Sequence, residues 1–134
     1  MDTDKHRFDQ FEKRSYLNLE TFRKSGQGVP TPVWFAEDQG VLYVTTDVNA
    51  GKVKRIRNNG RVRVAPCNGS GGLLGEWVEA QARLATDPQV IEKVKRLFRR
   101  KYGLMVTMFE TLGRLREDQR ATIAIEMEGI HEPG

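Results

Sequence analysis

Apolar and polar residues alternate along most of this chain, and a period of two residues is typical of β-strands with one buried face. In the segment 16–22, for example, Leu17, Leu19 and Thr21 fall on one face. Short stretches rich in Gly, Asp and Ser separate the alternating segments and predict turns. The pattern predicts six strands, at residues 16–22, 29–37, 41–46, 61–67, 77–84 and 121–128.

Helical periodicity replaces this alternation in a few places. Short helices are predicted over 8–13 and over 50–58, where apolar residues recur three positions apart. The longest helix is predicted over 88–102, because Asp87 can cap a helix whose first residue is a proline. The mixed pattern of residues 105–115 fits either a short helix or an irregular connection.

The order of these segments predicts the fold class. Strands that are joined mainly by hairpins, with only a few helices, favour a closed or partly closed antiparallel barrel over a parallel sheet. Pro32 lies inside a predicted strand and cannot donate a hydrogen bond to a neighbour, so it predicts an edge, a bulge or a place where a ligand approaches the backbone. The length of 134 residues suits a single domain over 1–134.

Composition and charge narrow the classes of function. The 22 Lys and Arg outnumber the 18 Asp and Glu, and the net charge of +4 favours anionic partners. No apolar run is long enough to span a bilayer and the first residues are polar, so we expect a soluble cytoplasmic protein without a membrane partner. Cys67 is the single cysteine, and His6 and His131 lie near opposite ends. We therefore expect neither an intrachain disulfide nor a built-in metal site.

One run of basic residues extends from Lys52 to Arg63, with no acidic residue among them. If Asn49 caps the helix predicted over 50–58, unpaired backbone N–H groups lie at its positive end, beside Lys52 and Arg55. Such a helix start predicts a cradle for a phosphate group. The same run could equally be a solvent-exposed surface. Nucleic acid is a weaker alternative, because aromatic residues are not interleaved with these cations.

No side chain can be assigned to catalysis from a motif. The sequence shows neither a nucleophilic triad nor paired carboxylates at a readable spacing. Hydride transfer remains possible without them, because a flavin-like cofactor supplies its own reactive atom. The same absence also fits a protein that is not an enzyme.

Four segments in fixed order resemble a known family. They are YLNLETFRKSG (16–26), TPVWFAEDQGVLYVTT (31–46), GKVKRIRNNGRVRVAPC (51–67) and GEWVEAQARL (75–84). They are similar to the pyridoxamine-phosphate-oxidase-like split-barrel superfamily, and more closely to its branch of oxidoreductases that depend on a deazaflavin, coenzyme F420.

The resemblance implies a mainly β fold, a six-stranded antiparallel split β-barrel of the FMN-binding type with a few peripheral helices. It also implies a homodimer with two cofactor sites at its interface. The implied activity is hydride transfer between coenzyme F420, or alternatively FMN, and a small organic acceptor. The alternative is a non-catalytic protein that binds or carries a flavin, a deazaflavin or haem.

The same resemblance implies where the cofactor lies in this chain. The residues that would bind its phosphate are Lys52, Lys54 and Arg55. The residues that would line its ring are Thr31, Pro32, Val33 and Trp34, with Thr45, Thr46 and Asn49 nearby. Trp77 would reach the cofactor from the partner chain. No catalytic residue and no metal ligand is implied.

Overall fold

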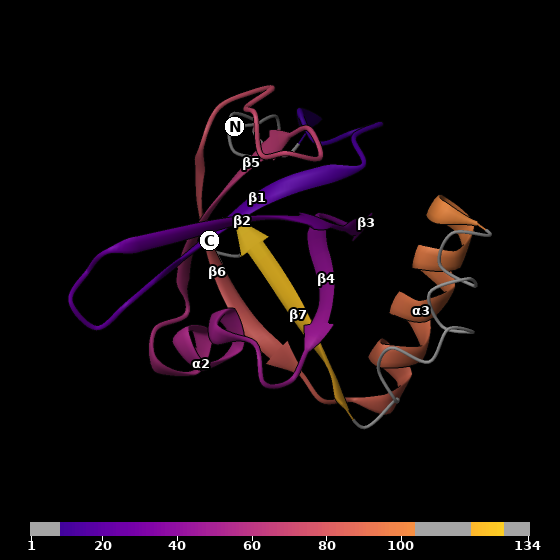
Figure 1. Cartoon of the computed structure of the whole chain (residues 1–134). Helices are drawn as coiled ribbons and strands as arrows, with labels where there is room; N and C mark the ends of the chain where they lie inside the picture. Colours follow the sequence, from indigo (N-terminus) through magenta and orange to yellow (C-terminus); the bar gives the residue numbers. More distant parts are fainter. Residues whose placement is uncertain (1–8, 104–118, 128–134) are drawn as a thin grey trace, which may run out of the picture.

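Seven strands and two helices make up the part of the chain that the computed structural model describes, residues 9–103 and 119–127 (Figure 1). The strands are β1 (Tyr16–Phe22), β2 (Gly28–Trp34), β3 (Ala36–Asp38), β4 (Val41–Asp47), β5 (Arg61–Cys67), β6 (Val78–Ala85) and β7 (Arg120–Met127). The helices are α2 (Gly51–Asn58) and α3 (Pro88–Tyr102). All neighbouring strands are antiparallel, and their order in the sheet is β2-β1-β5-β6-β7-β4-β3.

The sheet curls around its core, but it does not close into a barrel. Within the described residues β2 and β3 form its two edges and are not paired with each other. Figure 1 shows the curl, with α2 near one end of the sheet and α3 outside it. The predicted mainly β, antiparallel fold is confirmed. The prediction of a closed barrel is wrong, because the sheet has seven strands, not six, and its edge strands β2 and β3 are not paired in the described residues. Pro32 lies in the edge strand β2, which is one of the positions that its missing N–H predicts.

The seventh strand arises because the strand predicted over 29–37 is interrupted at Phe35. The backbone N–H of Phe35 donates to the Tyr102 hydroxyl (3.0 Å), and its carbonyl accepts from Lys101 Nζ (2.8 Å). The Tyr102 hydroxyl also lies 2.7 Å from the carbonyl oxygens of Phe35 and Ser15, either of which can accept its proton. Because α3 satisfies the backbone of Phe35, the chain can leave one strand and begin the next at this residue.

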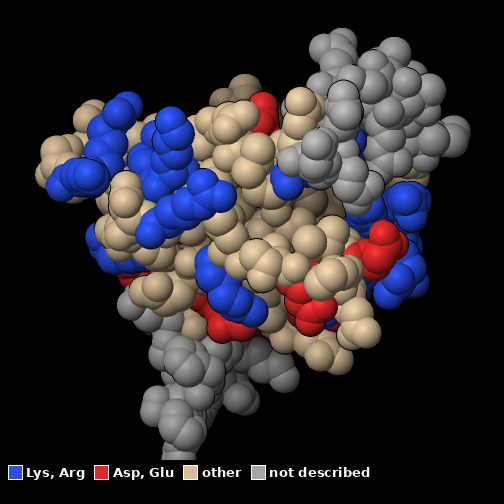
Figure 2. All heavy atoms as spheres, turned by 90° about the horizontal axis from the view of Figure 1, so that it is seen from below, with Lys and Arg blue, Asp and Glu red and all other residues tan. Residues whose placement is uncertain are grey.

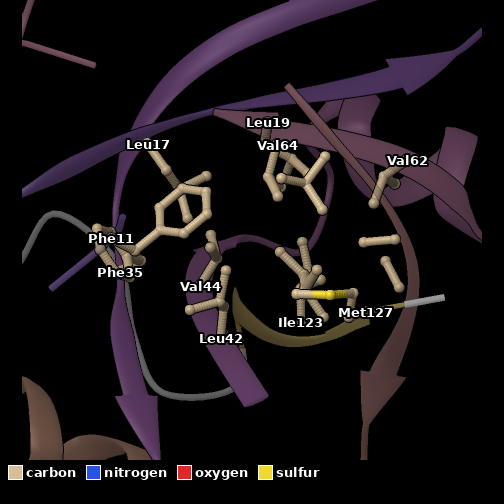
Figure 3. Close-up of a cluster of buried hydrophobic side chains, with 14 of the residues drawn as sticks. Phe11, Leu17, Leu19, Phe35, Leu42, Val44, Val62, Val64, Ile123 and Met127 are labelled. Atoms are coloured by element: carbon tan, nitrogen blue, oxygen red, sulfur yellow. The ribbon is translucent and has the colours of Figure 1, made fainter. Parts of the chain in front are cut away.

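The core lies on the inner face of the curled sheet. Leu17 and Leu19 of β1 are fully buried there, and they share this face with their cross-strand partners because directly paired residues point to the same side. Figure 3 shows the labelled side chains from several strands pointing toward one another. The labelled members of this cluster are Phe11, Leu17, Leu19, Phe35, Leu42, Val44, Val62, Val64, Ile123 and Met127.

The two helices bury one face each. In α2 the buried residues are Val53 and Ile56, and Ile56 belongs to the main core. In α3 Val94 and Phe98 pack in a second cluster on the outer side of β4 and β7. The predicted cap of α3 is confirmed, because the Asp87 carboxylate accepts a hydrogen bond from a first-turn N–H at 2.9 Å. No helix in the described ranges is long and apolar enough to cross a membrane.

Other boundaries follow the sequence closely. The strands predicted over 16–22 and 61–67 are confirmed at both ends. Apart from the split at Phe35, the other predicted strands differ from those observed by one residue at one or both ends, and residue 128 lies outside the described residues. The prediction for 105–115 lies outside the described residues, as does the first residue of the helix predicted over 8–13. In the described remainder of 8–13, Asp9 is helical and residues 10–13 form turns, with hydrogen bonds from Glu12 N–H to Asp9 O and from Arg14 N–H to Phe11 O.

Replacing Tyr102 by Phe should destabilise the protein by about 1–3 kcal/mol, because the hydroxyl is removed and the Phe35 N–H loses its acceptor. Urea denaturation of wild type and Y102F measures this difference in the free energy of unfolding. Tyr16→Phe is the matched control, since the Tyr16 hydroxyl makes no hydrogen bond within the described part of the chain. Equal losses of stability in both variants would refute the bridging role of Tyr102.

Candidate phosphate-binding site

The first turn of α2 presents unpaired backbone donors. Ala50 is its N-cap and provides no side-chain hydrogen bond. The predicted cap, Asn49, is wrong: its backbone N–H donates to Asp47 Oδ1 (2.8 Å), so Asp47 closes the turn that leads into the helix. Within the described residues the N–H groups of Gly51 and Lys52 have no acceptor. Such donors at the positive end of a helix favour an anion.

The guanidinium of Arg55 lies beside this helix start. Its Nε donates a hydrogen bond to Thr21 Oγ1 at 2.6 Å. A Cβ placed on Gly51 would lie only 2.8 Å from a terminal nitrogen of Arg55, so the glycine leaves the space that the guanidinium uses. Arg55 therefore adds charged donors to the same small region as the free backbone N–H groups.

The cations of this region disfavour one another. Burial, followed by the positive charge of Arg55, lowers the pKa of Lys52. Burial and the nearby charge of Arg23 lower the pKa of Arg55. Both shifts show that the charged forms are less favourable here than in water, and a bound anion would reverse the effect.

Lys52 and Arg55 have no acidic partner in the described part of the chain. By contrast, two arginines of β5 are neutralised, in the pairs Arg61–Glu79 (3.2 Å) and Arg63–Glu20 (2.7 Å). Figure 2 shows Lys and Arg side chains gathered on the side of the molecule that carries α2 and the β1–β2 hairpin.

The third predicted phosphate ligand, Lys54, is placed differently. Lys54 is exposed on α2, whereas Lys52 is partly buried. Residues two apart on a helix do not share a face, so the two lysines project in different directions. The structure thus brings Lys52 and Arg55 together and leaves Lys54 on open surface.

The predicted ring-lining residues of β2 are divided between the two faces of the sheet. Thr31 pairs with Leu19 and therefore faces the inner side, and Val33 packs against the core from the same side. Pro32 and Trp34 fall on the opposite face, where the Trp34 ring stacks on Tyr102 with centroids 4.5 Å apart. Side-chain alternation prevents all four from lining one surface.

Thr31 has a feature that favours a ligand. Its Oγ1 is buried and has no hydrogen-bond partner in the described part of the structure. A buried hydroxyl without a hydrogen-bond partner destabilises the fold. A ligand that lies outside the described residues could supply that partner. Thr31 is two positions along the sheet from Thr21, on the same face, because its partner Leu19 is two residues before Thr21.

The predicted threonines of β4 also alternate. Thr46 is partly buried and lies on the same face as Leu42 and Val44, which belong to the core. Thr45 is exposed on the other face, opposite Thr122 of β7. Only Thr46 can therefore join Thr31 on the inner side.

Trp77 lies apart from the other predicted residues. Val78 is buried on the inner face, so Trp77, which precedes it, points to the outer face. There the Arg63 guanidinium covers its ring at 4.8 Å from the centroid. Within one chain Trp77 is thus on the opposite side of the sheet from Thr31.

Two members of the site were missed by the sequence analysis as functional residues. Thr21 was assigned only to a strand face, although a hydroxyl beside Leu17 and Leu19 on the core face was a usable signal. Gly51 had no distinguishing signal, because its contact with Arg55 depends on how that side chain folds back along the helix.

Nearly the whole chain, residues 3–132, matches the family model described as pyridoxamine 5'-phosphate oxidase. The chain belongs to this family. A search of curated proteins found no match.

Solved structures with this fold carry different descriptions. One is a conserved hypothetical protein from Mycobacterium tuberculosis (TM-score 0.71, 19% identity, covering 94% of this chain and 81% of that one). Another is the haem storage protein HutZ from Vibrio cholerae (TM-score 0.70, 16% identity, 96% and 92%). A third is an F420 reductase (TM-score 0.56, 22% identity, 90% and 91%). At these identities the likeness concerns the fold alone.

Replacing Arg55 by Ala should weaken the binding of inorganic phosphate by roughly tenfold or more, because hydrogen bonds between charged groups contribute about 1.5–3 kcal/mol. Phosphate that binds the folded state raises the melting temperature. We expect this rise to be smaller in R55A, when phosphate is compared with chloride at equal ionic strength.

Arg61→Ala is the control for this measurement. Arg61 is paired with Glu79 on β6, so its removal should leave the phosphate effect unchanged. A melting temperature that responds equally in wild type and R55A would show that the site is misplaced.

Proposed function

We propose that this protein is an oxidoreductase that holds the phosphate of coenzyme F420, or alternatively of FMN, at the start of α2. It would pass a hydride between that cofactor and a small organic acceptor. The observation that carries the proposal is a pair of cations, Lys52 and Arg55, that have no carboxylate partner among the described residues and lie beside backbone N–H groups without an acceptor there. Membership of the pyridoxamine 5'-phosphate oxidase family supports it.

The residues of the inner face fit such a cofactor. Lys52, Arg55 and the N–H groups of the first turn of α2 would hold the phosphate. The Thr31 hydroxyl, which has no partner among the residues that the structure describes, and the partly buried Thr46 would face the ring. Lys54 is exposed, so its charge would contribute less because water and salt screen it.

When bound, a flavin or deazaflavin ring supplies the hydride chemistry. Lys52 and Arg55 would hold the phosphate, and Thr31 of β2 would orient the ring. No described side chain needs to act as a general acid or base for this role. The resemblance of the sequence to the deazaflavin-dependent branch favours coenzyme F420 over FMN.

A homodimer is part of this proposal. Trp77 lies on the outer face of its own sheet, so it could meet a cofactor bound at Arg55 only from a second subunit. A chain of 134 residues also has limited surface with which to enclose an extended cofactor alone.

Titration of the purified protein with coenzyme F420, FMN and riboflavin tests the cofactor. We expect saturable binding of F420 or FMN, and weaker binding of riboflavin, which lacks the phosphate. Lys52→Ala should reduce FMN or F420 affinity about tenfold while leaving riboflavin binding unchanged. Equal affinity for FMN and riboflavin would contradict the phosphate site.

Turnover separates the proposed enzyme from a carrier. Reduced cofactor should be oxidised in the presence of a panel of unsaturated or planar acceptors, as followed by absorbance. Saturable binding of haem in place of F420 and FMN would instead assign the protein to the carrier class.

Mixed dimers test whether one site uses both chains. Refolding a mixture of Arg55→Ala and Trp77→Ala chains should restore one intact site in each mixed dimer, because the two defects then fall in the same second site. The recovered cofactor binding is measured by titration, with each variant refolded alone as the control. If Trp77 and Arg55 acted within one chain, mixing would restore nothing.

A further inference from the structure

We propose that Thr21 is a positioning residue of the phosphate site, whose hydroxyl holds the Arg55 guanidinium over the first turn of α2. Thr21 acts through Arg55, so this role depends on the proposed function. This role adds a residue of β1 to the candidate site. The residues predicted from the sequence lie on α2, on β2 and β4, and in the segments that precede α2 and β6.

Thr21 is a rigid acceptor. Thr21 is 0% exposed and pairs with Val29 of β2, and the residue before it, Glu20, is also paired with Arg63 of β5. A β-branched side chain in a strand has restricted rotation about χ1. The oxygen that accepts the Arg55 Nε hydrogen bond at 2.6 Å therefore has little freedom to move.

This hydrogen bond decides which donors of Arg55 remain for a ligand. A guanidinium has five N–H donors in a fixed plane, and Thr21 uses the one on Nε. The four on the terminal nitrogens remain, and one of these nitrogens lies beside Gly51 at the helix start. Fixing Nε thus aims the remaining donors at the region of the free backbone N–H groups.

Without Thr21 the charges would favour a different arrangement. Arg55 and its cationic neighbours repel one another, since the charge of Arg55 lowers the pKa of Lys52 and the charge of Arg23 lowers the pKa of Arg55. An unanchored arginine has considerable rotamer freedom and would move its charge out into water. The hydroxyl of Thr21 opposes that movement before any anion is present.

A double-mutant cycle with Thr21→Val tests this role. The probe is FMN, or coenzyme F420 if wild type binds only that cofactor, and the measured quantity is its dissociation constant. T21V should weaken binding about 5- to 10-fold, less than the loss of Arg55 itself. Thr21→Ser, which keeps the hydroxyl, should restore most of the affinity. If T21V does not fold, Thr21→Ala removes the hydroxyl with less steric change.

The background variant is Arg55→Lys, which keeps the positive charge but has no Nε donor. In that background T21V should have no further effect on affinity, whereas a general structural defect would weaken binding in both backgrounds. Melting temperatures confirm that each variant is folded.

The outcomes separate the two proposals. If Arg55→Ala weakens binding and T21V does not, the positioning role is wrong and the phosphate site stands. If T21V weakens binding equally with Arg55 or Lys at position 55, the role is also wrong. If Arg55→Ala has no effect, or neither cofactor binds, the proposed site fails and the role of Thr21 fails with it.

Discussion

The alternation of side chains along β1 is the constraint on which both the core and the candidate site depend. Leu17 and Leu19 point inward and are fully buried, and the next inward position is Thr21, which meets Arg55. A single face of one strand thus passes from apolar packing to polar contact within a few residues. The same rule acts on β2, where it directs Thr31 inward and sends Trp34 to the other face. The position of the site relative to the core is therefore a property of strand geometry.

Lys52 and Arg55, which pair with no carboxylate in residues 9–103 and 119–127, have an energetic cost in the folded protein. Lys52 and Arg55 are partly buried, and each has a positively charged arginine nearby. Both effects lower the pKa values of their side chains. Other arginines of the same surface are paired with carboxylates, as Arg61 and Arg63 on strand β5 show. Unfavourable electrostatics of this kind are typical of functional sites, because a bound ligand supplies the missing opposite charge. Binding of an anion would be expected to stabilise the fold as well as to position the ligand.

Local sequence patterns predicted most of the elements, because strand alternation and helix capping act over a few residues. The strands at 16–22 and 61–67 and the Asp87 cap are examples. The break at Phe35 could not be predicted, because it depends on Tyr102, 67 residues away. The same limit applied to the site. The basic run identified Lys52 and Arg55, but the choice of Asp47 over Asn49 at the helix start, and the contact of Arg55 with Thr21, depend on three-dimensional geometry.

The place of β7 in the sheet has a consequence for the order in which the chain can assemble during synthesis. β7 is the last described strand, yet it lies between β6 and β4. Until it emerges from the ribosome, the strands can form only two separate pieces, β2-β1-β5-β6 and β4-β3, each with an exposed edge. The inner faces of both pieces carry core residues, so a nascent chain without β7 would expose apolar surface that β7 covers. Joining of the two pieces is thereby tied to the synthesis of β7.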